Sequence, residues 1–452
     1  MTAKMIEGYL PNDTPPFGRM LVLGLQHVLT MFPATVLVAL LVGFDVGTVL
    51  TVSGVATITA LVLSKQFSGK FIPLYYGSSF SYIAATLVIT NADFGVYAGD
   101  KVAIAQVGIV ATGVINIIVG FLVRAGGRKI IDRILPPVIT GSVAAVIGVA
   151  LSFAALDMAS ADWLVALITL LVTVLFSVYL QGRGFFGLIP VLLGAIVGYI
   201  VAALFGLVDL AAVGAAEWVL VPQFTLPAFT SPKAWEAIAA IAIIAVATIP
   251  ESTAHLYQIS LYVDNLAENM GREKLNLRDL IGLNLILDGL GDAINGMFGG
   301  VAGTNYGENN SLMVITRNYS GPALITAGAL AILLGFIGKL TALVGTIPLA
   351  VTGGLAIYLF GIIGMQGVAL MQAEKVNLYD PRQLAIGAVI LVIGIGGHIG
   401  FGGNLPIEVP GIFPDGLPAI ATAAVAGILL NLIFLAFKAP EEAALEVTEL
   451  TD

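Results

Sequence analysis

Leu135-Pro-Pro-Val-Ile-Thr-Gly-Ser-Val143 recurs in the second half of the chain as Ile347-Pro-Leu-Ala-Val-Thr-Gly-Gly-Leu355, with a proline, a threonine and a glycine at the same places. A second pair of related stretches is Tyr76-Gly-Ser-Ser79 and Tyr306-Gly-Glu-Asn309. In each half of the chain this stretch comes before the proline-containing one, so the order of the two motifs is the same. Each member of this second pair opens a short apolar segment with residues that favour a turn. The sequence therefore predicts two related halves.

The composition places these halves in a lipid bilayer. Hydrophobic residues make up 58% of the 452 residues and charged residues only 10%, with a mean hydropathy of +1.00, whereas soluble proteins average about 25% charged residues. A span needs about 20 apolar residues, so the length allows a dozen or more spans. The chain contains no cysteine, which excludes disulfides, thiolate metal sites and a cysteine nucleophile.

The apolar stretches number fourteen. The stretch 306–317 is too short to cross about 30 Å of hydrocarbon as a straight helix, so we predict a half-helix or an extended piece there. Seven spans in each half is an odd number, so the second half enters the membrane from the opposite side, as in inverted-topology repeats. The predicted fold class is an all-α polytopic membrane protein with short extended strands at the broken segments 3 and 10. The fourteen stretches are 17–43, 47–64, 71–90, 101–123, 134–156, 162–180, 186–207, 232–262, 279–297, 306–317, 322–343, 347–371, 384–397 and 417–437.

The positive charges support this count. With an internal N-terminus, the 19 lysines and arginines all fall in inner loops except Lys101, Lys233 and Lys339. This asymmetry is the one that the positive-inside rule demands. It predicts a multi-pass protein of the cell (inner) membrane with both termini cytoplasmic. The C-terminal tail is acidic and is expected to be solvated and disordered; its acids are Glu441, Glu442, Glu446, Glu449 and Asp452.

Two glutamates in the apolar half of the chain predict the functional site. A carboxylate at membrane depth costs roughly 2.5 to 3.5 kcal/mol or more, so Glu251 and Glu308 are expected to have a function or a partner. Glu308 follows Gly307 at one broken segment, and Gly77 occupies the same place at the other. Glycines there let the backbone approach a ligand closely. The alternative is that both breaks are only capped helix ends.

Free N–H groups at the starts of the two half-helices are expected to donate to carbonyl oxygens of a ligand. Aromatic side chains at the breaks could stack on a planar ligand. The expected donors include the N–H groups of Ser79, Phe80, Glu308 and Asn309, and the aromatic residues are Tyr76, Phe80, Tyr306 and Tyr358.

Other polar residues suggest proton chemistry. His255 lies one helical turn after Glu251, so the two can hydrogen-bond and histidine can pass a proton. Gln26 and His27 could complete a polar network or simply pack between helices. Asp288 and Asp292 are also one turn apart; they could belong to a proton or cation path, and the structural alternative is that they pair with donors on a neighbouring span.

Several functions are excluded by missing motifs. The chain has no phosphate-binding Gly-Lys-Ser/Thr loop, no His-Glu-x-x-His motif and no basic aromatic patch, so ATP-driven transport would need a second polypeptide and no nucleic-acid partner is expected. No cofactor is predicted. The partners expected are a small-molecule ligand, membrane lipid and a co-transported proton.

Tyr306-Gly-Glu-Asn-Asn-Ser-Leu-Met-Val-Ile-Thr-Arg317 is similar to the signature of the nucleobase–cation symporter-2 family, also called nucleobase–ascorbate transporters. That signature has an acidic or amide residue, an asparagine, a small residue and a distal Thr-Arg. The chain resembles the uracil permease branch of this family along nearly its whole length. The Gln26-His27 pair, the Gly-Ser-Ser-Phe80 stretch and the spacing of Glu251 and His255 match separately.

The resemblance implies a core domain, which carries the substrate, moving against a gate domain. The core would comprise residues 1–133 and 232–343, and the gate would comprise residues 134–231 and 344–452 with the cytoplasmic tail. It also suggests a homodimer formed through the gate domains.

The resemblance also implies roles for individual residues. Glu251 and Glu308 would bind the base, Phe80 and Gly307 would contribute backbone contacts, and Tyr358 would face the site from the gate. With the residues singled out above, the predicted substrate site is Glu251, Glu308, Phe80, Gly307, Tyr306, Ser79 and Tyr358, and the predicted proton-coupling residues are His255, Glu308, Glu251 and His27.

Three departures from the family pattern leave the base open. Ser311 stands where the signature usually has glycine, Ser252 stands beside the glutamate where a histidine-like polar group is common, and Pro33 lies in the first span. Uracil is the predicted substrate, and a purine such as xanthine, guanine or hypoxanthine is the alternative.

The predicted function is proton-coupled import of a nucleobase, not an enzymatic reaction. Carboxylates accept from the N–H groups of uracil while half-helix amides donate to its carbonyls. Three rivals remain open. An anion exchanger would have its substrate repelled by two carboxylates, an intramembrane hydrolase would use them as acid and base, and a passive channel would show no uphill uptake.

Overall fold

The computed structural model describes residues 8–127, 133–181, 183–410, 413 and 416–437. The acidic tail and the inner-loop cations Arg128 and Lys129 lie outside these residues. In the described part, eight helices or joined helix pairs are long and apolar enough to cross a membrane, and four shorter apolar helices accompany them. The protein is a mostly helical, multi-span membrane protein.

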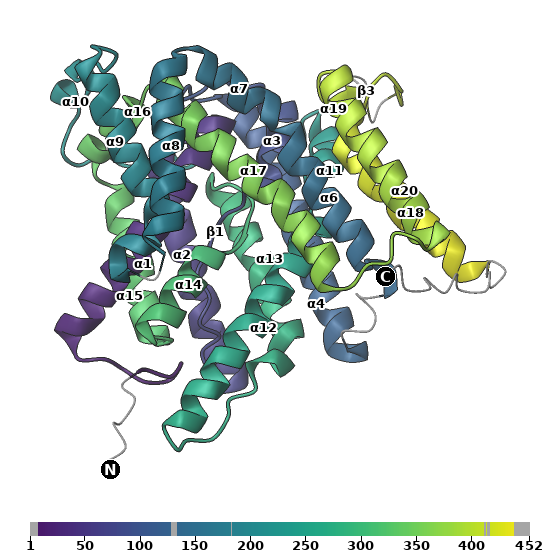
Figure 1. The fold of residues 1–452 in the computed structure, drawn as a ribbon, viewed down its shortest axis with the longest axis horizontal. Coiled ribbons are helices and arrows are strands. Elements are labelled where there is room, and N and C mark those ends of the chain that lie inside the picture. The colour runs from purple at the N-terminus through teal and green to yellow at the C-terminus, as the bar shows by residue number, and fades with distance from the viewer. Residues whose placement is uncertain (1–7, 128–132, 182, 411–412, 414–415, 438–452) are drawn as a thin grey trace, which may run out of the picture.

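A first helix group packs around α4 and α13 (Figure 1). Gly113 on α4 and Gly289 on α13 allow the contact, because a Cβ on either would collide with the carbonyl oxygen of the other. Membrane helices associate through close packing of this kind, which small residues allow, because the surrounding lipid is itself apolar and the hydrophobic effect does not drive the helices together. The group comprises α1 (Phe17–Val42), α2 (Val46–Ser68), α3 (Ile83–Thr90), α4 (Asp100–Gly126), α11 (Ala234–Ala242), α12 (Ala245–Asn269), α13 (Ile281–Phe298), α14 (Gly307–Thr316) and α15 (Gly321–Gly335).

A second helix group packs around α17, which runs diagonally across the middle of the view (Figure 1). The two copies of the repeated motif begin helices of this group, with Pro136 before α6 and Pro348 before α17. The two copies of the sequence motif thus occupy the same place, at the start of a helix. The group comprises α6 (Pro137–Ala150), α7 (Ser152–Ser160), α8 (Trp163–Tyr179), η2 (Gly184–Leu188), α9 (Pro190–Leu204), α17 (Leu349–Ala373), α18 (Pro381–Leu391), η4 (Val392–Gly396), α19 (Gly397–Gly400) and α20 (Ala419–Ala436).

Two expected spans are interrupted. The stretch 232–262 breaks at Ile243 and Ile244, between α11 and α12, and α12 continues to Asn269. The stretch 322–343 divides into α15 and α16 (Gly338–Gly345). Here the short helix α16 contacts α10 (Ala211–Ala215), and a β-bridge joins Val219 to Ile337. Another short strand pair, β3 (Asn404–Leu405) with β4 (Leu417–Pro418), precedes α20.

Both predicted breaks contain a short strand. β1 (Tyr76–Ser78) pairs antiparallel with β2 (Gly303–Asn305), so that Gly77 faces Thr304. Ser53 and Thr57 on α2 hold the strand in place, because their hydroxyls donate to the Tyr76 carbonyl at 2.8 and 3.0 Å. The chain enters a 3-10 turn (η1, Phe80–Tyr82) and α3 after β1, and α14 after β2. The pair thus sets two helix starts side by side near the middle of the molecule.

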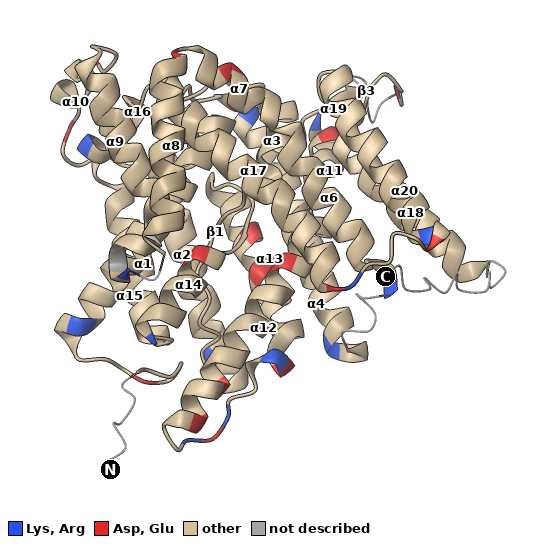
Figure 2. Cartoon of the chain, in the orientation of Figure 1, with Lys and Arg blue, Asp and Glu red and all other residues tan. Residues whose placement is uncertain are grey.

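The charged residues are unevenly distributed over the molecule. Lys and Arg residues lie mostly toward the end of the molecule where α1 begins, while acidic residues also lie at mid-height around α13 and α14 (Figure 2). Mid-height acids inside a bundle of apolar helices mark the region of interest.

The N-terminal segment crosses one end of the first helix group and is held there by Asp13. Both of its carboxylate oxygens accept from Arg272, at 2.7 and 2.9 Å, and one also accepts from the Leu10 N–H at 2.8 Å. Partial burial raises the pKa of Asp13, but the Arg272 and Leu10 hydrogen bonds and the Arg272 charge lower it more, so the pKa lies below its usual range.

We expect Asp13→Asn to lower the free energy of unfolding by about 0.5 to 1 kcal/mol at neutral pH, the range for a partly exposed ion pair. A depressed carboxyl pKa stabilises the fold above the unfolded pKa of about 3.9, and this is lost as the pH falls through the folded pKa. The difference in unfolding temperature between wild type and variant should thus be constant well above the unfolded pKa and vanish as the pH falls through the folded pKa. Asp93→Asn, at an exposed site, is the control; an equal effect there would refute the assignment.

Candidate functional site

Glu308 lies in the first turn of α14, directly after the strand pair. The first N–H groups of a helix have no partner four residues back, and the helix dipole is positive there. The Glu308 side chain is exposed to a cavity rather than buried. Donors and a carboxylate therefore meet at one helix start.

This cavity has a volume of about 250 Å³ and lies between the two helix groups. Its first-group wall carries Glu308 and the Phe80 ring, and the second group closes the other side with α8, α9 and α17. A planar ring of one or two cycles fits such a volume. The lining residues are Thr30, Pro33, Ala34, Phe80, Ser177, Gln181, Gly187, Ile189, Pro190, Val191, Leu192, Glu308, Ser311, Ile315 and Leu359.

Glu251 approaches Glu308 from α12. It is half-buried and follows Pro250 within the helix. Its carboxyl group interacts electrostatically with both His255 and Glu308. The two glutamates thus lie within electrostatic reach of each other, but Glu308 lines the cavity and Glu251 is not among its lining residues; their role in binding stays a prediction.

His255 hydrogen-bonds to a different residue from the one expected. Its Nδ1 lies 2.9 Å from both the carbonyl and the side-chain oxygen of Asn305, and because those oxygens only accept, Nδ1 carries the proton. The Nε2 edge of the ring lies against Gly307, where a Cβ would come within 2.9 Å of Nε2. His255 therefore ties the end of β2 to α12 and keeps Nε2 beside the start of α14, within electrostatic reach of Glu251.

A buried polar network behind the site was missed by sequence reasoning. The Ser252 hydroxyl accepts from the side-chain amides of Asn284 and Asn305, at 2.9 and 2.8 Å, and Asn284 accepts from the Tyr76 hydroxyl at 3.0 Å. These residues are at most 3% exposed. The available signal was the line of polar residues Asn284, Asp288 and Asp292, four apart on one face of an apolar helix.

We expect Ser252→Ala to lower the free energy of unfolding by about 2 to 4 kcal/mol, because it leaves two buried amide donors without their acceptor. Affinity for the ligand of the cavity should fall as well, since Asn305 also positions His255. Thermal unfolding and calorimetric binding measure the two effects. Ser160→Ala, on the exposed end of α7, is the control, and equal stability of the two variants would show that the network contributes nothing.

The start of η1 is only partly as predicted. The Ser79 N–H was expected to be free, but it donates to the Ala302 carbonyl at 3.1 Å. The two backbone segments therefore stay hydrogen-bonded one residue beyond the strand pair. That part of the prediction was wrong. Ser79 instead caps the turn with its hydroxyl, which accepts from the Ser81 N–H at 3.2 Å. The Phe80 ring lines the cavity and packs edge-on against Phe360, with centroids 6.4 Å apart.

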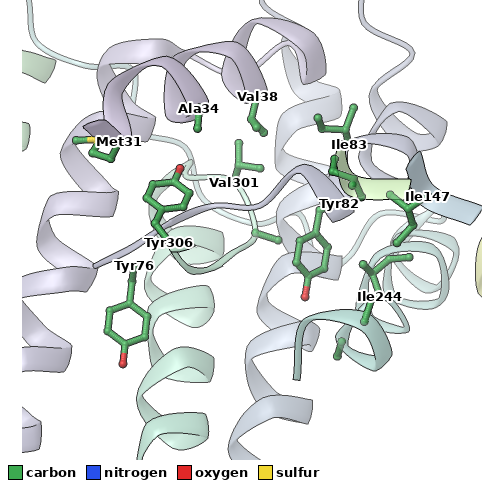
Figure 3. Packing of buried hydrophobic residues seen from close by; sticks show 14 of the residues in the cluster. Met31, Ala34, Val38, Tyr76, Tyr82, Ile83, Ile147, Ile244, Val301 and Tyr306 are labelled. Atoms are coloured by element: carbon green, nitrogen blue, oxygen red, sulfur yellow. The ribbon is translucent and has the colours of Figure 1, made fainter. Parts of the chain in front are cut away.

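The tyrosines of the two breaks point away from each other (Figure 3). Tyr306 is directed toward α1, where its hydroxyl lies 2.8 Å from the Thr35 hydroxyl, and its ring stacks on Tyr75. Both Tyr76 and Tyr306 are buried. Their rings support the strand pair instead of facing the cavity, and Gly77 leaves room for the Tyr306 ring, which a Cβ at that position would meet.

The second helix group contributes through α17. Leu359 lines the cavity and Phe360 contacts Phe80. Tyr358, predicted to face the site, is their half-buried neighbour on the same helix.

His27 is held against α14. The Asn309 side-chain amide donates to His27 Nδ1 at 3.0 Å and to the His27 carbonyl at 3.2 Å, so the ring carries its hydrogen on Nε2. Both residues are at most 1% exposed. This contact positions the first turn of α14 on α1, and its part in proton coupling stays a prediction.

Comparisons with known proteins identify the family. A model of xanthine and uracil permeases, described as a permease family, matches residues 18–402. The chain belongs to this permease family. A uracil permease of Bacillus caldolyticus is 36% identical over 434 residues, covering 93% of each chain, and a uracil permease of Escherichia coli K12 is 34% identical over 457 residues, covering 98% of each. This permease is accordingly a transporter and not an enzyme, which removes the hydrolase rival.

Solved structures confirm the type of fold. The transmembrane domain of the cyanobacterial bicarbonate transporter BicA matches the permease with a TM-score of 0.56 at 17% identity, over 94% of this chain and 99% of that one. The murine anion transporter Slc26a9 matches with a TM-score of 0.62 at 11% identity, over 94% of this chain and 69% of that one. At such low identity the likeness concerns the fold alone.

Proposed function

We propose that this permease imports uracil together with a proton. The observation that carries the proposal is Glu308 at the start of α14, lining a cavity of about 250 Å³, with Glu251 on α12 within electrostatic reach of it. Uracil presents N–H donors and carbonyl acceptors around one flat ring. Carboxylates accept the first, and unpaired helix amides donate to the second. The full-length similarity to proteins named uracil permeases supports the same substrate.

The proposed architecture is fourteen segments in two inverted repeats. The first helix group corresponds to the core, residues 1–133 and 232–343, and the second to the gate, residues 134–231 and 344–452. The placement of Pro136 and Pro348 before equivalent helices and the pairing of β1 with β2 support the repeat. The cavity lies where the two groups meet, so sliding of one group would change its exposure.

We place the permease in the cell (inner) membrane with both termini cytoplasmic, following the distribution of lysine and arginine. A homodimer through the gate is proposed from the family resemblance. Proton coupling is proposed for Glu251, Glu308 and His255. The proton affinity of such a group changes when it moves from a desolvated site into contact with water.

Two alternatives to proton-coupled uracil import are tested by the same experiment. A purine ligand would use the same acceptors and donors, and the volume alone does not reject a two-ring base. Anion exchange is the rival within the fold shared with the anion transporter Slc26a9, and it is disfavoured because Glu308 faces the cavity and repels an anion.

A thermal-shift screen of the purified permease followed by uptake into liposomes tests the proposal. Uracil should raise the unfolding temperature more than xanthine, guanine, hypoxanthine or bicarbonate, since a ligand that binds the native state stabilises it. An inward proton gradient should drive uphill accumulation of unchanged radiolabelled uracil. A larger shift with a purine would reassign the substrate, and equilibration without accumulation would indicate a passive channel.

A further inference from the structure

A second pair of carboxyl groups lies behind the substrate cavity. Asp288 and Asp292 are one turn apart on α13, and each is 2% exposed. Among the described residues, no salt bridge or hydrogen bond joins either to a lysine, arginine or histidine. The titratable groups that face the pair from the elements packed around it are Glu251 on α12, Tyr76 on β1 and Tyr82 on η1.

Two buried carboxylates without a positive partner are strongly disfavoured. Burial penalises each negative charge, and the charges also repel each other. A bound metal ion or a bound proton would neutralise this excess negative charge. Asp292 accepts from the Gly303 N–H at 2.7 Å and from the Asn116 side-chain amide at 3.1 Å, and Asp288 accepts from the Thr304 hydroxyl at 3.4 Å.

These surroundings suit a proton rather than a metal. N–H groups occupy oxygen positions that a cation would need, and the described residues contain no group of three or more acidic, histidine or cysteine side chains able to hold a metal ion. A carboxylic acid paired with a carboxylate needs no additional space, and one proton between two such groups is a familiar arrangement.

Asn116 is the buried side chain that can respond to a proton on Asp292. Its side chain is 0% exposed, its Nδ2 contacts Asp292, and its Oδ1 has no hydrogen-bond partner among the described residues. A buried carbonyl without a donor costs about 1 to 3 kcal/mol. A half-turn of the amide would pair Oδ1 with the O–H group of a protonated Asp292 and leave Nδ2 unpaired instead, so Asn116 can hydrogen-bond to Asp292 in either protonation state.

We propose that Asp288 and Asp292 together hold one proton, at a site distinct from the substrate glutamates, and that binding and release of this proton are coupled to transport in addition to the proton exchange proposed for Glu251, Glu308 and His255. The inference rests on the proposed proton-coupled import. An O–H bond forms on Asp292, or on Asp288, when the proton arrives from water on the outer side, and the same bond breaks when the proton leaves to water on the inner side. No other bond changes.

Strand β2 connects this site to the substrate. At its beginning, the Gly303 N–H bonds to Asp292 and the Thr304 side chain reaches Asp288. At its end, Asn305 holds His255, and three residues further lies Glu308. Protonation of Asp292 weakens the charge-assisted bond to Gly303, so it acts on one end of a three-residue strand whose other end positions the substrate site.

The test uses Asp292→Asn and Asp288→Asn, which imitate the protonated form with nearly unchanged shape, and Asp157→Asn, at an exposed site on α7, as the matched control. Each variant is reconstituted into liposomes. Uracil counterflow, which needs no gradient, should stay within about twofold of wild type in Asp292→Asn, while accumulation driven by a proton gradient should fall at least about tenfold, because the coupling is a free energy that the neutral variant no longer has.

A second measurement does not depend on transport. In infrared difference spectra between acidic and alkaline pH, the carbonyl band of protonated carboxylic acid should lose intensity in Asp292→Asn and in Asp288→Asn but not in Asp157→Asn. Unchanged spectra in both variants, or gradient-driven accumulation equal to wild type in Asp292→Asn, would overturn the inference. If the wild type itself neither binds uracil nor accumulates it, the proposed function fails instead; if either variant does not fold, the spectrum of the other decides.

Discussion

Glu308→Gln is expected to weaken uracil binding by at least about thirtyfold, or roughly 2 kcal/mol, and to abolish gradient-driven uptake. The glutamine keeps the size of the side chain but replaces a charged acceptor with a neutral amide that also presents donors. At this helix start, donors would then face the N–H groups of the base. Glu251→Gln should have a similar effect on uptake, since its carboxyl group meets the same site from α12.

Isothermal calorimetry on the purified permease and uptake into liposomes measure these effects. Glu374→Gln, at an exposed turn after α17, removes one acidic charge away from the cavity and should behave as wild type. Unchanged uracil affinity in Glu308→Gln would show that the base binds elsewhere.

Gly303→Ala is expected to separate the two strands. A Cβ at this position would collide with the carbonyl oxygen of Gly77 in the partner strand, and backbone cannot move aside as a flexible side chain does. Overpacking of this kind costs about 1 to 3 kcal/mol of stability. The larger effect should be on function, because β2 carries both the Asp292 contact and the start of α14; the uracil-induced thermal shift should disappear.

Gly291→Ala is the matched control for this experiment. Gly291 is also buried, one residue before Asp292, but a Cβ there would meet only the Ala56 methyl group at 3.8 Å. Alanine in a helix interior is favoured over glycine by up to about 1 kcal/mol, so this variant should be at least as stable as wild type. Equal losses in the two alanine variants would show that the strand pair is not the sensitive element.

The sequence predicted the site better at the level of segments than at the level of contacts. It identified both breaks, and the structure has a strand at each. It also identified Glu251, Glu308 and His255 as polar residues out of place in apolar helices. It expected His255 to bond to Glu251 because the two are one turn apart, whereas Asn305, fifty residues along the chain, is the partner.

The same limit explains the tyrosines and Ser79. Local pattern placed Tyr306 at a break, and a ring beside a ligand was a reasonable expectation. Its partner is Thr35, on the first helix of the chain. Likewise, a free N–H at Ser79 followed from helix geometry alone, but the second half of the chain supplies Ala302 as its acceptor.

By itself, the sequence determined that this protein spans a membrane many times, and it predicted related halves and acidic groups within apolar helices. Hydropathy, glycine and proline placement and charge asymmetry are local properties, and the cost of exposing backbone or charge to lipid makes them decisive. Only the tertiary structure decided which polar groups meet. Ser252 joins Asn284 to Asn305, and Asn116 reaches Asp292, because helices distant in sequence pack within hydrogen-bonding distance, and no spacing along one segment encodes that approach.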